Sequence, residues 1–527
     1  MRPPHLLLLL LSHRFSAASL FPHTSIGSLW GTNIHFTAPS SPMELPLLSA
    51  AFRVARMDFT WSSIETTCGA YDFSAYDLLL ASLTAVNVTP YWILDYSNPA
   101  CYPPAAPGSR SCATPACIAG YACFAAAAGA HFRGRGVLWE SVNEPNGMGG
   151  DPPAVIAALC AGAGGALRAL GEAFVGPATA GVPLDYLASA IDAGLLSSVS
   201  GVSVHPYRAA APEDALGDLA ALRALLDAKG GAGLPILSGE WGYTSAEPPC
   251  AYGNRRDRAT QGKYVPRMWF TTLLAGLTGV PQIHYDWKDD GANLTDCESN
   301  FGSVTATADP GAPFSPKPAY LAALAAQRAV GGAAAAAAGR VKGVVLDPPA
   351  AALNVTPASA FVLAFSGGSL PGGVAFAAWT NVSTCPQGGG GAPCGGAGTN
   401  ASEGACLAAG CCFFGASSCT APQPLAVACP ASVELRRDCG FSGVSRAQCE
   451  GRGCCWDANE PAAGGPQCFF REPLGAVGAA FPVAPLPADT CFEASDVFGF
   501  DRGRVCAAAG AVRVALTDGP QYLRALV

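Results

Sequence analysis

The fold of this 527-residue chain is decided by two short stretches, Trp139-Glu140-Ser141-Val142-Asn143-Glu144-Pro145 and Leu237-Ser238-Gly239-Glu240-Trp241-Gly242. Each is an apolar segment of strand-like composition that ends in a polar turn carrying a glutamate. Both lie in a region, from about residue 28 to 330, where short segments rich in β-branched and aromatic residues alternate with longer Ala/Leu-rich helical patterns. That alternation predicts βα units around a parallel sheet.

Eight segments between residues 28 and 330 are predicted to be the strands of this sheet. They are Leu29–His35, Val54–Phe59, Thr89–Leu94, Gly136–Ser141, Ala173–Gly176, Val199–His205, Pro235–Gly239 and Val280–Tyr285. Helical patterns such as Val155–Leu170 and Pro318–Val330 lie between and after them. Eight strands in about 300 residues predict a (β/α)8 barrel, although a doubly wound open sheet would alternate in the same way.

Glutamate placement favours the barrel. Glu144 follows the fourth predicted strand and Glu240 follows the seventh, so both fall at the carboxyl-terminal face, where barrels carry their active sites. Strands four and seven lie across the barrel mouth from each other, so the two carboxylates are expected to converge. A convergent pair suits cleavage of an acetal, because one carboxyl group can give a proton to the leaving oxygen while the other stabilises or attacks the sugar carbon.

These motifs resemble those of the clan A glycoside hydrolases, with the cellulase-like family five and family thirty-nine as the nearest relatives. The resemblance covers about residues 28–330 and implies that Glu144 is the acid/base and Glu240 the nucleophile of a retaining enzyme. Asn143, which precedes the acid/base, is expected to bind the substrate 2-hydroxyl. Neither a zinc spacing nor a phosphate-binding loop is evident, so we expect no metal and no cofactor.

Other residues in the same region extend the resemblance. Arg56 resembles the strand-two arginine that holds the nucleophile, and His205 and Tyr207 resemble the strand-six pair that touches nucleophile and substrate. Trp287 resembles the sugar-stacking tryptophan of the clan, and His35 is a candidate substrate contact near the end of strand one.

Several acidic residues are weaker candidates. Asp58, Glu65, Asp95 and Asp286 stand near strand ends and could line the same site. The group of Asp286, Asp289 and Asp290 has the composition of a calcium site, but a solvated loop is the favoured interpretation.

Beyond residue 340 the pattern changes to strands without long helices. We predict a small all-β sandwich in two parts, residues 333–383 and 473–527, interrupted by a Cys/Gly-rich insertion. The barrel domain is predicted to occupy residues 20–332, after a signal peptide over residues 1–19 that has an apolar run and small residues for cleavage.

The insertion contains a strong disulfide motif at residues 427–472, which resembles the trefoil (P-type) domain. Six cysteines in about 40 residues make a scaffold that is too small for a conventional core. Spacing alone cannot fix their connectivity. The resemblance implies three disulfide bonds, Cys429–Cys455, Cys439–Cys454 and Cys449–Cys468. Residues 384–422 resemble a second, degenerate trefoil, and either glycan attachment or a spacer role is open for both modules.

Composition points to the secretory route. The chain has 22 cysteines and five Asn-x-Ser/Thr triplets, which suit an oxidising compartment. We expect disulfide bonds Cys250–Cys297, between neighbouring barrel loops, and Cys491–Cys506, within the β domain. A net charge of −8 without a basic block argues against a nucleic-acid partner, and no apolar segment is long enough to predict a membrane span.

The sequence therefore predicts a secreted retaining β-glycoside hydrolase that acts on a β-linked poly- or oligosaccharide. An alternative is a catalytically inactive barrel that binds carbohydrate, and a third is a structural wall protein held by its trefoils. The presence of both glutamates together with Arg56, Asn143 and Tyr207 favours the enzyme, because a lectin would tolerate their loss.

Overall fold

A computed structural model describes residues 25–104, 112–147, 150–306 and 314–334 of the first region. Farther along it describes residues 338–341, 360–370, 374–380, 477–483, 486–487 and 489–526, with several isolated short strands between them. The predicted signal peptide and most of both predicted trefoil modules lie outside the described residues.

The first region is built on a nine-stranded parallel sheet with the order β5-β4-β3-β2-β1-β9-β8-β7-β6. Its strands are β1 (Trp30–Asn33), β2 (Val54–Thr60), β3 (Thr89–Asp95), β4 (Leu138–Glu140), β5 (Phe174–Val175), β6 (Thr179–Ala180), β7 (Val202–His205), β8 (Ile236–Trp241) and β9 (Gln282–His284). All eight predicted strands are present, and the two-residue strand β6 is additional.

The sheet curls until its edges meet, as a barrel requires. A parallel bridge joins Val175 of β5 to Gly201, just before β7. The Gly176 amide donates to the Gly201 carbonyl and the Ser203 amide donates to the Gly176 carbonyl, both at 3.2 Å. These bonds close the ring between β5 and β7, so the (β/α)8 interpretation is confirmed over the open sheet.

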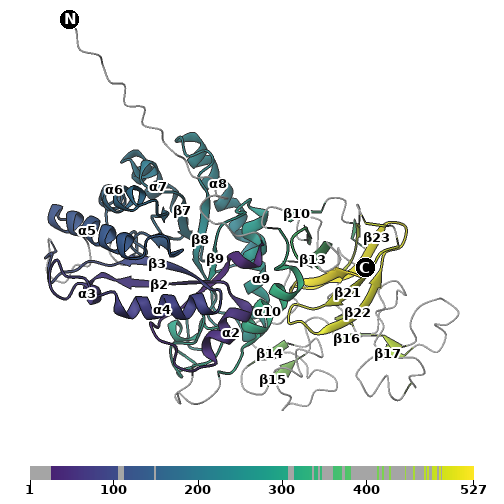
Figure 1. The fold of residues 1–527 in the computed structure, drawn as a ribbon. Helices are drawn as coiled ribbons and strands as arrows, with labels where there is room; N and C mark the ends of the chain where they lie inside the picture. The colour runs from purple at the N-terminus through teal and green to yellow at the C-terminus, as the bar shows by residue number, and fades with distance from the viewer. Residues whose placement is uncertain are drawn as a thin grey trace, which may run out of the picture.

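Helices alternate with the strands and surround them (Figure 1). They are α2 (Glu44–Ala51), α3 (Trp61–Ile64), α4 (Ser74–Ala85), α5 (Pro115–His131), α6 (Pro153–Ala169), α7 (Leu184–Asp192), α8 (Ala215–Ala228), α9 (Arg258–Leu274) and α10 (Pro318–Val330). Two of them begin at side-chain caps, since Thr114 accepts from the Cys117 amide and Asp257 from the Thr260 amide. None of the helices among the described residues is both long enough and apolar enough to cross a bilayer.

The second region is a two-sheet sandwich, as predicted. A six-stranded sheet has the order β10-β12-β13-β24-β21-β22, and a three-stranded sheet has the order β11-β20-β23. Its strands are β10 (Ala338–Arg340), β11 (Val345–Leu346), β12 (Ala360–Ser366), β13 (Val374–Thr380), β20 (Val477–Pro482), β21 (Cys491–Ser495), β22 (Asp501–Cys506), β23 (Ala511–Leu516) and β24 (Gln521–Ala525). Strand β13, before the insertion, pairs with β24, after it, so the two sequence halves form one domain.

Both sheets of the sandwich contribute to one apolar core. Phe376 of β13 makes a tilted contact with Phe481 of β20 and an edge-to-face contact with Phe492 of β21, and all three are buried. Inside the insertion, the backbone is described for short strands that include β14 (Cys412–Phe414), β15 (Ser418–Thr420), β17 (Cys455–Trp456) and β18 (Cys468–Phe469). The pairs β14–β15 and β17–β18 are antiparallel.

A buried polar network fixes the sandwich against the barrel. Arg267 of α9 forms a two-pronged ion pair with Glu213, at 2.8 and 2.5 Å, and donates to the Asp518 carbonyl in the sandwich. Glu213 also accepts from the Trp379 indole of β13 at 2.7 Å. In Figure 1 helices α9 and α10 accordingly lie between the barrel and the sandwich. Glu213, in the short 3-10 helix Pro212–Asp214 before α8, therefore connects the two domains.

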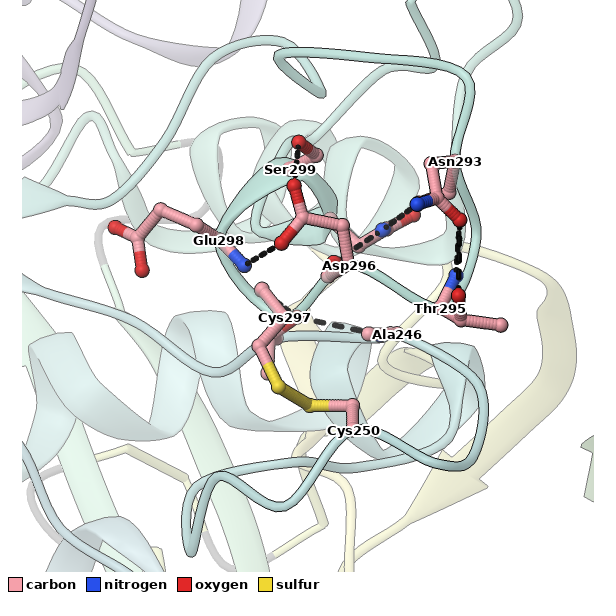
Figure 2. The surroundings of a disulfide bond; sticks show 10 residues. Ala246, Cys250, Asn293, Thr295, Asp296, Cys297, Glu298 and Ser299 are labelled. Atoms are coloured by element: carbon pink, nitrogen blue, oxygen red, sulfur yellow. Dashed lines mark hydrogen bonds between the residues drawn. A yellow bond between two sulfur atoms is a disulfide. The ribbon is translucent and has the colours of Figure 1, made fainter.

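Two predicted disulfide bonds are confirmed. Cys250 and Cys297 are bonded and join the loops that follow β8 and β9 (Figure 2). Cys491 and Cys506 join neighbouring strands β21 and β22. Cys68–Cys101 and Cys112–Cys117 are further bonds, which spacing had left open. The three bonds expected for the trefoil at residues 427–472 involve positions outside the described residues, or ones whose side chains are not described, and stay predictions.

Replacing Arg267 with Met should leave the Glu213 carboxylate buried and without its cation. Removing one partner of a buried ion pair costs about 3–5 kcal/mol, so we expect a loss of that size in the free energy of unfolding measured in urea. Lys229→Met is the matched control, because Lys229 and Asp192 form an exposed pair that is worth about 0–1 kcal/mol. Equal losses for both variants would show that the Arg267 network does not hold the domains together.

Candidate active site

Arg56, from β2, is the hub of the polar groups at the carboxyl end of the barrel. Its side chain is 1% exposed. Nη1 donates to Glu240 at 2.8 Å and to Asn33 at 3.0 Å, Nε donates to Glu140 at 2.7 Å, and Nη2 donates to Asn143 at 2.8 Å. One guanidinium on β2 thus binds side chains from β1, β4 and β8, which suits its planar set of five donors.

Glu144 and Glu240 converge on this hub. Glu240 stands in β8, and Glu144 lies four residues beyond β4 with φ of +46°, in the left-handed region. Backbone conformations of this kind are costly for a residue other than glycine and are found at functional sites. Side-chain oxygens of the two glutamates and the His205 imidazole all lie within 4.8 Å of one another. The two side chains are 22% and 12% exposed, so both are accessible from the barrel mouth.

His205 ends β7 and Tyr207 follows it, and both side chains contact the glutamates. The His205 ring is fully buried, and its Nδ1 lies 2.9 Å from Glu144 while Nε2 lies 3.2 Å from Arg56. The Tyr207 hydroxyl donates to Glu240 at 2.7 Å. The structure therefore brings together five of the residues expected from the sequence around Glu240.

The surroundings shift the pKa values of three side chains in the site, Arg56, Tyr207 and Glu144. Burial lowers the pKa of Arg56, but the charges of Glu140 and Glu240 outweigh it and raise the pKa above its ordinary value, so the guanidinium remains charged beside Glu240. Burial and the charge of Glu240 raise the pKa of Tyr207 well above its ordinary value, so its hydroxyl remains a donor. Burial by itself raises the pKa of Glu144, but the hydrogen bond and charge of His205 lower it overall.

Sequence reasoning missed the group beneath this site. Glu140 is completely buried in β4 and accepts from Arg56 and, at 2.5 Å, from the Tyr91 hydroxyl of β3. Asn33, at the end of β1, accepts from the same guanidinium. A signal for Glu140 was available, because an ionisable residue inside an otherwise apolar buried strand needs a partner.

The weaker acidic candidates have separate roles. Asp95, buried at the end of β3, accepts from the Asn143 amide at 2.7 Å and so positions the loop before Glu144. Glu65 accepts from the Trp61 indole and the Gly69 amide and has no contact with the two site glutamates. Asp58 is exposed in β2.

His35 and Asp286 lie together beside the hub, after β1 and β9. The His35 Nδ1 lies 3.0 Å from Asp290 and 3.9 Å from Asp286. Burial lowers the pKa of His35, but Asp290 and Asp286 outweigh it and raise the value to about 9.

The expectation that Trp287 presents a sugar-stacking face does not agree with its position. The side chain is 1% exposed, its indole N–H donates to Glu44 of α2 at 3.0 Å, and its ring packs against Phe52, Phe314 and Tyr320. Buried Glu44 offers an acceptor that draws the indole inward, so the ring belongs to the packing between β9 and the helices.

Fold and site together define a (β/α)8-barrel protein with two convergent glutamates at its mouth, joined to a β-sandwich. Residues 429–471 match the model of the trefoil (P-type) domain. The fold is similar to a family 39 glycoside hydrolase from the gut symbiont Bacteroides cellulosilyticus WH2, with 17% identity over 96% of this chain and 83% of that chain and a TM-score of 0.62. It is also similar to a GH30 endoxylanase from Clostridium papyrosolvens C71, with 11% identity over 96% and 97% of the two chains and a TM-score of 0.52. At these identities the likeness is one of fold.

Replacing Arg56 with Met should leave the Glu140 and Glu240 carboxylates without their cation, and Glu140 is fully buried. We expect the free energy of unfolding in urea to fall by about 3–5 kcal/mol. Adding Glu140→Gln should restore part of that loss, because it removes the buried charge that Arg56 no longer neutralises. If the double variant loses as much unfolding free energy as the two single variants together, or more, the proposed pairing of Arg56 with Glu140 is wrong.

Proposed function

We propose that this chain is a secreted retaining β-glycoside hydrolase that cleaves a β-linked poly- or oligosaccharide, with Glu240 as nucleophile and Glu144 as acid/base. The separation of the two carboxylates carries the proposal. Retaining enzymes hold the pair about 5–5.5 Å apart, whereas inverting enzymes need about 6.5–9.5 Å to admit a water molecule. One carboxylate oxygen of Glu144 lies within 4.8 Å of one carboxylate oxygen of Glu240, and this short separation fits the first class.

The surroundings of Glu240 suit a nucleophile. Arg56 places a permanent positive charge 2.8 Å from one oxygen, and the Tyr207 hydroxyl donates to the other oxygen at 2.7 Å. Both contacts stabilise a negative charge and fix the direction of attack. In the first step a Glu240 oxygen bonds to the anomeric carbon as the glycosidic C–O bond breaks.

The surroundings of Glu144 suit a group that changes protonation during the cycle. Among the described residues its ion-pair partner is His205, which carries a charge only when it is protonated. In the first step Glu144 gives its proton to the departing oxygen. In the second step it takes a proton from a water molecule that attacks the anomeric carbon and releases Glu240.

Secretion is supported by several described features. The four disulfide bonds of the described residues fit an oxidising compartment. Asn293, the first residue of an Asn-Leu-Thr triplet, is exposed in the loop closed by Cys297 (Figure 2), as a glycan acceptor must be. The match at residues 429–471 supports a trefoil module, whose role is either attachment of the enzyme to glycan or that of a spacer.

Replacing Glu240 with Ala should lower kcat on aryl β-glycosides by about a thousandfold or more, because no glycosyl-enzyme forms. Azide should restore part of the rate and give an inverted glycosyl azide. Glu144→Gln should cost about a hundredfold to ten-thousandfold, least for substrates with good leaving groups. Glu247→Gln is the matched control, since Glu247 is exposed on the loop after β8. Binding of oligosaccharide without turnover by the native protein would instead support the inactive carbohydrate-binding barrel.

His205→Asn should move the alkaline limb of the kcat/KM profile to higher pH. His205 lowers the pKa of Glu144, so its removal keeps the acid protonated to a higher pH. The Tyr207 hydroxyl donates to Glu240 and not to Glu144. Tyr207→Phe should therefore reduce the rate without moving this limb. An alkaline limb that stays in place in His205→Asn would contradict the assignment of Glu144 as the acid.

A further inference from the structure

A second polar cluster lies beside the candidate active site, between the loops that follow β1 and β9. It consists of His35, Asp286 and Asp290, which line part of a cavity of about 200 Å³. One ligand atom from each residue lies within 4.8 Å of the other two, and the His35 Nδ1 lies 3.0 Å from Asp290 and 3.9 Å from Asp286. The proposed double displacement assigns no bond-making or proton-transfer step to these three residues, and the expectation that His35 contacts substrate stays a prediction.

Asp286 supplies an independent observation that something is missing from this cluster. Its side chain is 3% exposed, and among the described residues its Oδ1 atom has no hydrogen-bond partner. A buried carboxylate oxygen without a partner is unfavourable, and such groups in native proteins call for a bound ion or water. The second carboxylate, on Asp290, adds further negative charge beside it.

Neighbouring ammonium groups are already committed elsewhere. Lys317 pairs with Asp289 at 2.7 Å, and Lys288 donates to Glu44 at 3.2 Å. Asp289 also accepts from the Gly302 amide. Asp289 is therefore bound by Lys317, and of the three aspartates considered from the sequence only Asp286 and Asp290 lie beside His35.

We propose that His35, Asp286 and Asp290 bind a divalent transition-metal ion, with Zn²⁺ and Mn²⁺ as the candidates. An imidazole nitrogen with two carboxylates suits ions of this class, whereas Ca²⁺ and Mg²⁺ prefer oxygen ligands alone. Ligands about 2.0–2.2 Å from a tetrahedral Zn²⁺ stand about 3.3–3.6 Å apart. The His35 Nδ1 atom lies 3.0 Å from Asp290 Oδ1 and 3.9 Å from Asp286 Oδ2, and these two separations bracket that range.

The ion would supply a partner to Asp286 and cancel the charge of two carboxylates. It would also join the end of β1 to the loop after β9, next to Asn33 and the Arg56 hub. Glu144, His205 and Glu240 form a second group with ligand-like spacing, but Arg56 and Tyr207 already bind the two oxygens of Glu240, whereas Asp286 has a buried oxygen without a partner among the described residues. We therefore place the ion at His35 and not between the two glutamates of the candidate active site.

Isothermal titration of the metal-free protein with Zn²⁺, Mn²⁺, Ca²⁺ and Mg²⁺ tests this site directly. We expect one Zn²⁺ or Mn²⁺ per chain, bound more tightly than Ca²⁺ or Mg²⁺, and a higher melting temperature with the ion. His35→Gln and Asp290→Asn should each weaken binding at least about tenfold. Asp185→Asn, an exposed aspartate of α7, is the matched control and should bind like the native protein.

Two results would overturn the proposal. One is the absence of saturable binding of either transition metal by the folded native protein. The other is binding that survives His35→Gln and Asp290→Asn but is lost in Glu240→Gln, which would place the ion between the two glutamates. Because the measurement is of binding, it stands apart from glycoside hydrolysis, and either claim can fail without the other.

Discussion

A single buried guanidinium determines how the mouth of this barrel is arranged. Arg56 pairs with Glu140 below it and with Glu240 above it, and it also holds Asn33 and Asn143. A fully buried cation is tolerated only where carboxylates and acceptors surround it. Strands β1, β4 and β8 must therefore meet around the Arg56 side chain of β2. This constraint sets the place of Glu240 and, through Asn143, of the turn that carries Glu144.

The rest of the fold supports that arrangement from outside. Closure between β5 and β7 fixes the positions of β4 and β8 on opposite sides of the ring. The Arg267–Glu213 pair fastens helix α9, which follows β8, to the sandwich. The Cys250–Cys297 bond joins the loops after β8 and β9, so the strand that carries Glu240 is restrained by a helix and a covalent bond.

Much of this architecture could be predicted from the sequence because strands, turns and loop cysteines are local signals. The eight strands follow from patterns within a few residues, and the convergence of Glu144 with Glu240 and the Cys250–Cys297 bond follow from the order of those strands around the barrel. Side-chain direction could not be predicted in this way. Trp287 turns inward because Glu44, distant in sequence, accepts its N–H, and Asp289 is held by Lys317. Glu140 stood within a quoted motif, yet its partner Arg56 lies 84 residues away.

The central claim is that the Glu144–Glu240 spacing permits double displacement, and the stereochemistry of hydrolysis tests it most directly. Proton NMR of the native protein acting on an aryl β-glycoside that it cleaves should show the β-anomer of the free sugar as the first product, with the α-anomer appearing later through mutarotation. First release of the α-anomer would mean a single displacement by water. That result would contradict the role given to Glu240 and the interpretation of the distance between the two carboxylates.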